Sequence, residues 1–94
     1  MAPHTLEKSR LIVDVLIPAL NEEATVGPVV TGVRVCGQPV RHVVLVDNGS
    51  TDKTAFIAEQ HGALVVPEPA RGYGPACLRG LRLIEQQNRR ADRL

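Results

Sequence analysis

Three short apolar runs divide the chain, and each is followed by a segment in which apolar residues recur at helical spacing. The runs are rich in β-branched residues and do not alternate with polar ones, as in parallel strands whose two faces are both covered. The predicted strands are residues 11–17, 40–46 and 63–66. The predicted helices are residues 22–35, 51–60 and 75–88. The order βαβαβα with short connections predicts an α/β fold with three layers, in which helices cover both faces of a parallel sheet.

Turn and capping residues set the expected ends of these elements. Pro18 cannot donate a backbone hydrogen bond to a neighbouring strand, so we expect it to end the first strand. Asn21 is the expected N-cap of the first helix, and Ser50 or Thr51 is the expected N-cap of the second. Gly62 is expected to end the second helix, because glycine readily adopts the left-handed conformation found after helix C-termini.

The three strand-to-helix loops carry most of the polar chemistry. They contain residues 18–22, 47–52 and 71–74, and in a parallel sheet all three open at the same edge. A carboxylate or amide at a strand tip can hydrogen-bond to a nucleobase, glycines let the backbone approach ribose or phosphate, and Arg71 adds a positive charge. The loops together indicate a nucleotide pocket. The competing interpretation is that Asp47 and Ser50 only end a strand and cap a helix.

Other nucleotide-binding and catalytic motifs fit the sequence poorly. A dinucleotide-binding Gly-x-Gly-x-x-Gly should follow the first strand, but the first glycine after that strand is Gly27. Gly72 and Gly74 follow the third strand instead, and the next glycine is Gly80. The sequence has no Walker A lysine motif, and no Ser/His/Asp or Cys/His set falls at positions that the predicted topology would bring together.

Composition and charge narrow the class of protein. The chain has 94 residues, of which 44% are hydrophobic and 22% charged, a balance typical of one small globular domain. The formal net charge of +1 gives no reason to expect nucleic acid as a partner. The polar stretch 1–10 is expected to be a disordered lead-in, and the sequence contains neither a signal peptide nor an apolar run of about 20 residues. We therefore expect a cytoplasmic protein without a membrane span.

Three motifs in the expected order resemble those of the family 2 glycosyltransferases. They are IPALNEE at 17–23, VDNGSTDKT at 46–54 and RGYGPA at 71–76. The resemblance covers residues 11 to about 85 and is strongest to the branch related to dolichyl-phosphate mannose synthase and the polyprenyl-phosphate sugar synthases. It implies the Rossmann-like N-terminal half of a GT-A fold, which binds a UDP- or GDP-sugar.

The resemblance also implies roles for individual residues. Those expected to line the base and ribose are Pro18, Ala19, Leu20 and Glu22. Those expected at the nucleoside are Asp47 and Asn48, with Asp52 behind them supporting the loop. Those expected near the base or the diphosphate are Arg71, Gly72 and Gly74. In many relatives the position of Asn48 is acidic and reads the imino group of the base; the amide oxygen of Asn48 can accept the same hydrogen bond without a charge.

Two parts of the family's catalytic machinery have no counterpart in this sequence. Relatives hold a divalent cation, Mg²⁺ or Mn²⁺, with an Asp-x-Asp on the next strand, and use a later carboxylate as general base. The last residues, 91–94, fall about where that strand should begin, and Asp92 starts no Asp-x-Asp. We therefore expect residues 11–90 to form a truncated, partial GT-A domain with no catalytic residue and no metal ligand of its own.

Two functions remain open at this point. The first is that of a glycosyltransferase by family, which in full-length form transfers sugar to an acceptor such as a polyprenyl phosphate, at the cytosolic membrane face in some relatives. The second is a non-catalytic α/β module that binds a nucleotide or a protein. A three-stranded sheet with an uncovered edge also predicts self-association through that edge.

Overall fold

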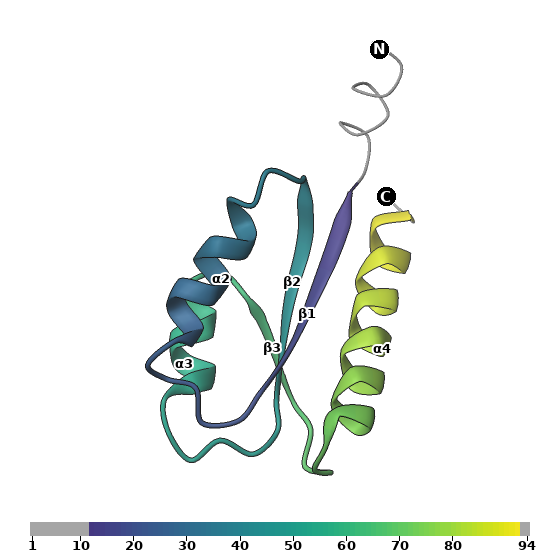
Figure 1. Ribbon diagram of the computed structural model, residues 1–94. Helices are drawn as coiled ribbons and strands as arrows, with labels where there is room; N and C mark the ends of the chain where they lie inside the picture. The colour runs from purple at the N-terminus through teal and green to yellow at the C-terminus, as the bar shows by residue number, and fades with distance from the viewer. Residues whose placement is uncertain (1–11, 93–94) are drawn as a thin grey trace.

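The protein is a three-layer α/β structure in which a parallel sheet lies between helices (Figure 1). The computed structural model describes residues 12–92, so the expected disordered lead-in over 1–10 and the start of the first predicted strand at Leu11 lie outside the described residues. The elements are β1 (Val13–Ala19), α2 (Val26–Arg34), β2 (Val40–Asp47), α3 (Thr54–Gln60), β3 (Leu64–Pro67) and α4 (Tyr73–Asp92). The predicted fold class and element order are confirmed.

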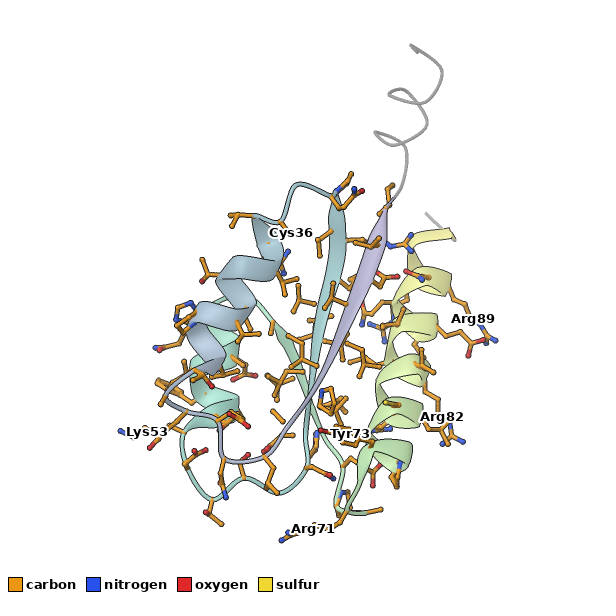
Figure 2. The ribbon with its side chains drawn as sticks, viewed as in Figure 1. Cys36, Lys53, Arg71, Tyr73, Arg82 and Arg89 are labelled. Atoms are coloured by element: carbon orange, nitrogen blue, oxygen red, sulfur yellow. The ribbon has the colours of Figure 1, made fainter. Side chains whose placement is uncertain are left out.

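The sheet has the strand order β1-β2-β3, and both strand pairs are parallel. Helices α2 and α3 cover one face and α4 covers the other, and side chains fill the space on both sides (Figures 1 and 2). The central strand β2 supplies both cores: Val43 and Leu45 pack under α2 and α3, whereas Val44 and Val46 pack under α4. All four are fully buried, which explains why this run shows no polar alternation.

The first strand does not end at Pro18, as the sequence predicted, but continues to Ala19. The Ala19 carbonyl accepts a hydrogen bond from the Asn48 backbone N–H at 2.9 Å, so Ala19 faces β2. Its neighbour Pro18 therefore turns its missing N–H towards the outer edge of the sheet, where none of residues 12–92 forms a further strand. A proline is tolerated in an edge strand at such a position.

Helix α2 begins at Val26, four residues later than the predicted start at residue 22. Asn21 is not its N-cap: Asn21 adopts a left-handed backbone conformation with φ 54°, and the residue before the helix is Thr25. The backbone N–H of Glu22 donates to Thr54 Oγ1 at 2.8 Å, which holds this segment against another loop. Contacts with a distant part of the chain therefore outweigh the local capping signal.

The start of β2 at Val40 and the end of α3 at Gln60 are as predicted, and the other boundaries differ by one to four residues. Helix α3 begins at Thr54 rather than 51, so neither Ser50 nor Thr51 is its N-cap, which is Lys53. Strand β3 covers Leu64–Pro67 instead of 63–66, and α4 covers Tyr73–Asp92 instead of 75–88. Gly62 follows the end of α3 with φ 97°, as predicted for a glycine after a helix C-terminus.

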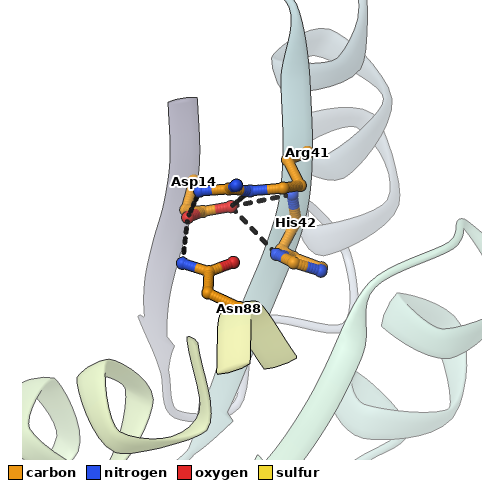
Figure 3. A network of polar contacts seen from close by, with 4 residues as sticks. All are labelled: Asp14, Arg41, His42 and Asn88. Carbon is orange, nitrogen blue, oxygen red and sulfur yellow. Dashed lines mark hydrogen bonds and ion pairs between the residues drawn. The ribbon is translucent and has the colours of Figure 1, made fainter. Parts of the chain in front are cut away.

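A polar network joins β1, β2 and α4 near the amino-terminal ends of the strands (Figure 3). The carboxylate of Asp14 accepts hydrogen bonds from Arg41 Nη2 at 2.9 Å and Nε at 3.2 Å, and from the His42 backbone N–H at 3.1 Å. His42 Nδ1 lies 3.0 Å from Asp14 Oδ1, and Asn88 Nδ2 donates to Oδ2 at 3.4 Å. The hydrogen bond from Arg41, more than any other contact, lowers the pKa of Asp14 from 3.8 to about 2.

We expect this network to make the stability of the domain sensitive to acid. Because the pKa of Asp14 is depressed in the folded state, its contribution is complete above the unfolded value and is lost as the pH falls through 3.8 towards about 2. Arg41 is partly exposed and screened, so the loss should amount to about 1–2 kcal/mol. Denaturant unfolding followed across this pH range should show the loss in the wild type but not in Asp14→Asn.

The matched control is Glu85→Gln, which removes the exposed ion pair with Arg89 and should leave the acid dependence unchanged. An equal acid dependence in Asp14→Asn would contradict the assignment.

Within residues 12–92, no helix has both the length and the apolar character required to cross a bilayer.

Candidate functional site

The three strand-to-helix loops converge at the carboxyl ends of the strands, as the sequence predicted. The first loop is 20–25, the second loop is 48–53 and the third loop is 68–72. The first two are tied together directly: the Asn21 backbone N–H donates to Ser50 Oγ at 2.9 Å, and the Thr51 N–H donates to Asn21 Oδ1 at 2.8 Å. This reciprocal pairing makes the loops one unit and explains the left-handed conformation of Asn21.

A second set of hydrogen bonds strengthens the same junction. The Glu23 backbone N–H donates to Asp52 Oδ2 at 3.1 Å, and the Lys53 N–H donates to Glu23 Oε1 at 3.1 Å. Asp52 also accepts hydrogen bonds from the backbone N–H and the hydroxyl of Thr54. The Thr54 hydroxyl contributes most to lowering the pKa of Asp52, which therefore stays ionised as an acceptor. Asp52, itself in the second loop, thus links this loop to the first loop through hydrogen bonds.

Asn48 connects the tip of β2 to the third loop. Its side-chain Nδ2 donates to the Glu68 and Ala70 carbonyls, both at 2.8 Å, and its Oδ1 accepts from the Gly72 N–H at 3.0 Å. Asn48 is one of the buried polar residues, with 8% of its surface exposed. Both N–H groups of the Asn48 amide and one lone pair of Oδ1 are therefore hydrogen-bonded to the third loop. The second lone pair of Oδ1 is left for a ligand.

A pocket of about 270 Å³ opens where the three loops meet. The residues that line it are Pro18, Ala19, Leu20, Glu22, Asn48, Arg71, Gly72 and Tyr73. Three of the site residues implied by the resemblance are not among them: Asp47, Gly74 and Asp52, the last of which was expected to support the loop. Asp47 Oδ1 accepts the Ser50 N–H at 3.0 Å and so shapes the second loop, and a role for Asp47 at the nucleoside stays a prediction. Gly74 belongs to the first turn of α4.

One lining residue, Tyr73, was not predicted from the sequence. It lies within the RGYGPA motif, two residues before the predicted start of the third helix at Pro75. In the structure Tyr73 is the first residue of α4, and 78% of its surface is exposed. Figure 2 places Tyr73 and Arg71 at the end of the molecule where the strands terminate. The available signal was the rarity of aromatic residues: the chain has one Tyr and one Phe.

The pocket combines an apolar wall with two charged side chains. The apolar surface comes from Pro18 and Ala19 at the end of β1 and from Leu20 directly after it, and it can contact a flat ring. The Glu22 carboxylate accepts a hydrogen bond from the Thr25 hydroxyl at 3.1 Å, and a carboxylate can accept further ones from ligand hydroxyls. Arg71 brings a guanidinium suited to phosphate. This arrangement fits a ligand with a ring, hydroxyl groups and an anionic group.

The described part of the chain does not fit a metal centre built from protein ligands. Among residues 12–92, no group of three or more His, Cys, Asp or Glu side chains is placed to hold a metal ion.

Comparison with known proteins bears on the same region. Residues 14–87 match the family model described as Glycosyl transferase family 2. An uncharacterised glycosyltransferase of Mycobacterium tuberculosis is 43% identical over 70 residues, which are 73% of this chain and 30% of the relative. Glucosyl-3-phosphoglycerate synthase of Mycolicibacterium smegmatis is 40% identical over 76 residues, which are 69% of this chain and 25% of the relative. The chain thus spans less than a third of the length of these relatives.

A solved structure shows the same fold. Glucosyl-3-phosphoglycerate synthase from Mycobacterium tuberculosis, in complex with Mn²⁺, UDP-glucose and glycerol 3-phosphate, superposes with a TM-score of 0.65 at 34% identity. The match covers 82% of this chain and 31% of the synthase chain. The three-stranded sheet with its helices therefore corresponds to the N-terminal, Rossmann-like half of a GT-A fold.

Proposed function

The chain belongs to glycosyl transferase family 2, and from that membership we propose that its loop pocket binds the nucleotide of a UDP-linked sugar. The observation that carries the proposal is the convergence of the three loops on one pocket lined by Glu22, Arg71 and apolar residues from the end of β1. The complex of the synthase with UDP-glucose supports UDP over GDP as the nucleotide.

The size of the pocket favours a part of the donor rather than all of it. Small-molecule pockets usually measure about 300–1,000 Å³. At about 270 Å³, this pocket suits a nucleoside, with the phosphates and sugar extending outwards. In this arrangement the apolar wall from Pro18 to Leu20 contacts the base, Glu22 accepts hydrogen bonds from the ribose hydroxyls, and Arg71 faces the diphosphate. The glycine at position 72 lets the backbone approach the ligand closely.

The proposal concerns donor binding. The 94-residue sequence contains no Asp-x-Asp, and among residues 12–92 no set of protein ligands is placed to hold a cation. The alternative function, a non-catalytic module that binds a nucleotide or a protein at the same edge, would use the same loops.

Other expectations from the resemblance stay proposals. A polyprenyl-phosphate acceptor has no support in the relatives named above: the two synthases are named for 3-phosphoglycerate, one of them is in complex with glycerol 3-phosphate, and the third relative is uncharacterised. Self-association through the outer edge of β1 and a location at the cytosolic membrane face likewise stay predictions.

Titration calorimetry with uridine, UDP, GDP and UDP-glucose tests donor binding. We expect UDP to bind, and Arg71→Ala to weaken UDP roughly tenfold because a hydrogen-bonded charge pair with phosphate is lost. The same substitution should leave uridine binding unchanged, since uridine carries no phosphate. The matched control is Arg82→Ala, an arginine on the outer side of α4 away from the loops (Figure 2).

Three results would count against the proposal. A folded chain that binds none of these nucleotides would favour a protein-binding module. An equal loss of UDP affinity in Arg82→Ala would show that net charge, rather than the pocket, holds the diphosphate. An equal loss of affinity for uridine and UDP in Arg71→Ala would show that Arg71 does not contact the phosphates.

A further inference from the structure

Tyr73 combines three properties that are unusual together in this chain. It is the only tyrosine of a chain with one phenylalanine and no tryptophan, it lines the loop pocket, and 78% of its surface is exposed. An aromatic ring can bury about 150–250 Å² when it packs against a partner. Most of the Tyr73 surface is thus not covered by the protein, and part of it lines the pocket.

The position of Tyr73 is set by the site itself. The preceding residue, Gly72, has φ 111° and joins the third loop to α4. Residues other than glycine adopt this backbone conformation only with strain. The backbone N–H of Gly72 is held by Asn48 Oδ1 at 3.0 Å. Asn48 thus acts as a positioning residue, because it fixes the backbone from which the Tyr73 ring projects.

The apolar part of the pocket lining comes from Pro18 and Ala19 at the end of β1 and from Leu20 directly after it. Apolar contact alone distinguishes poorly between a nucleobase and another flat apolar group. An aromatic ring in the same lining adds a preference for a nucleobase, since base–aromatic stacking contributes to affinity for every base and is not available to ligands that lack a π-face.

We propose that Tyr73 is a specificity-determining residue that stacks on the nucleobase of the donor and holds it against the wall formed by Pro18, Ala19 and Leu20. The proposal rests on the nucleotide-binding function proposed above and adds the residue that recognises the base. The phosphates face Arg71, so base and phosphate recognition belong to different residues of the third loop and the start of α4.

The sequence offers a direct readout. With one tyrosine and no tryptophan, the emission of the chain excited in the tyrosine band comes from Tyr73 alone. We expect UDP and uridine to quench the emission of Tyr73, because the base stacks on the ring, and inorganic pyrophosphate to leave the emission unchanged. The intensity is corrected for the light that the base absorbs, because a base stacked in the bound complex can lower the intensity without shortening the lifetime.

Affinities of variants, measured by calorimetry, give a second readout. Tyr73→Phe keeps the aromatic face and should bind UDP and uridine like the wild type. Tyr73→Ala should weaken both about fivefold to tenfold, the size expected for one stacked base. The matched control is Phe56→Ala, which removes the other aromatic residue, 58% exposed on α3 and outside the pocket lining, and should change neither affinity.

The two proposals fail in different ways. UDP binding with unchanged Tyr73 emission, or a Tyr73→Ala variant that binds UDP as tightly as the wild type, overturns the stacking role and leaves nucleotide binding intact. Quenching by pyrophosphate alone also overturns it, since the ring would then respond to phosphate. Absence of UDP binding to the folded wild type overturns both.

Discussion

Replacing Asn48 by aspartate should destabilise this domain by about 3 kcal/mol, although the two side chains have nearly the same shape and many relatives carry an acidic residue at this position. In this chain the Nδ2 atom of Asn48 donates to the carbonyls of Glu68 and Ala70, both at 2.8 Å. A carboxylate oxygen at this place would face two carbonyl oxygens at a buried position and lose both hydrogen bonds. The third loop, which carries Arg71, would keep the hydrogen bond from the Gly72 N–H but lose these two.

The matched control is the same chemical change at Asn21. The side chain of Asn21 acts as an acceptor in the structure, from the Thr51 N–H at 2.8 Å and the Thr51 hydroxyl at 3.4 Å. Aspartate accepts equally well and also tolerates left-handed backbone conformations. Asn21→Asp should therefore change the free energy of unfolding by less than about 1 kcal/mol.

Denaturant unfolding at neutral and acidic pH distinguishes the two variants. The pKa of the new carboxyl in Asn48→Asp should be raised above its unfolded value, because burial and two facing carbonyls oppose the charge. The deficit of this variant should therefore shrink as the pH falls and the carboxyl is protonated. A deficit that is equal in both variants, or that is independent of pH in Asn48→Asp, would contradict the hydrogen bonds assigned to Asn48.

The fold class was accessible from the sequence because each strand contains a short run of apolar residues without polar alternation. Val43, Val44, Leu45 and Val46 are buried on alternate faces, so the absence of polar alternation correctly indicated a covered parallel sheet. Convergence of the loops followed from the same topology, since parallel strands end at one edge. Both features follow from the spacing of apolar residues and from the direction of the strands, which can be taken from the sequence itself.

The helix starts were not accessible, because they are decided by partners far along the chain. Asn21 and Glu22 donate their backbone N–H groups to side chains 29 and 32 residues away, those of Ser50 and Thr54. Local capping rules consider only neighbours in sequence, and so they placed both helices too early. The same limit applies to Asp14, whose contact with Asn88 joins residues 74 positions apart.

The candidate site was predicted more fully for backbone than for side chains. The loops that carry Leu20, Arg71 and Gly72 line the pocket as expected from their positions at strand ends. Asp47 is absent from the pocket lining and accepts the Ser50 N–H, whereas Tyr73, at the first position of α4, lines the pocket. Which way a side chain points at a loop depends on hydrogen bonds that a motif does not specify.

Gly80 is a buried position of α4 against the sheet, and Gly80→Ala should destabilise the domain by about 2–3 kcal/mol. A Cβ atom added here would lie 2.6 Å from Leu16 Cγ and 3.0 Å from Val46 Cγ2. Alanine would normally gain about 1 kcal/mol over glycine inside a helix. The steric overlap outweighs this gain, because Val46 is fully buried in the core cluster under α4 and Leu16 packs against that cluster.

Gly32→Ala supplies the matched control, since it makes the same change in an exposed helical position. A Cβ atom at Gly32 meets nothing within 4 Å among the described residues, so helix propensity alone should act and stabilise the domain by about 0.5–1 kcal/mol. Denaturant unfolding of the two variants should therefore give effects of opposite sign. Equal signs would show that α4 does not rest on the sheet through Gly80.

A double substitution identifies the atom responsible for the clash. Leu16→Ala removes the side chain that a Cβ at position 80 would meet, and alone it should cost about 2–3 kcal/mol through the cavity it leaves. In the double variant with Gly80→Ala the new methyl group enters that space, so the combined loss should fall short of the sum by about 1 kcal/mol or more. Strict additivity would place the overlap at Val46 instead. Since a domain of this size typically has only about 5–15 kcal/mol of stability in total, each of these differences is large enough to measure.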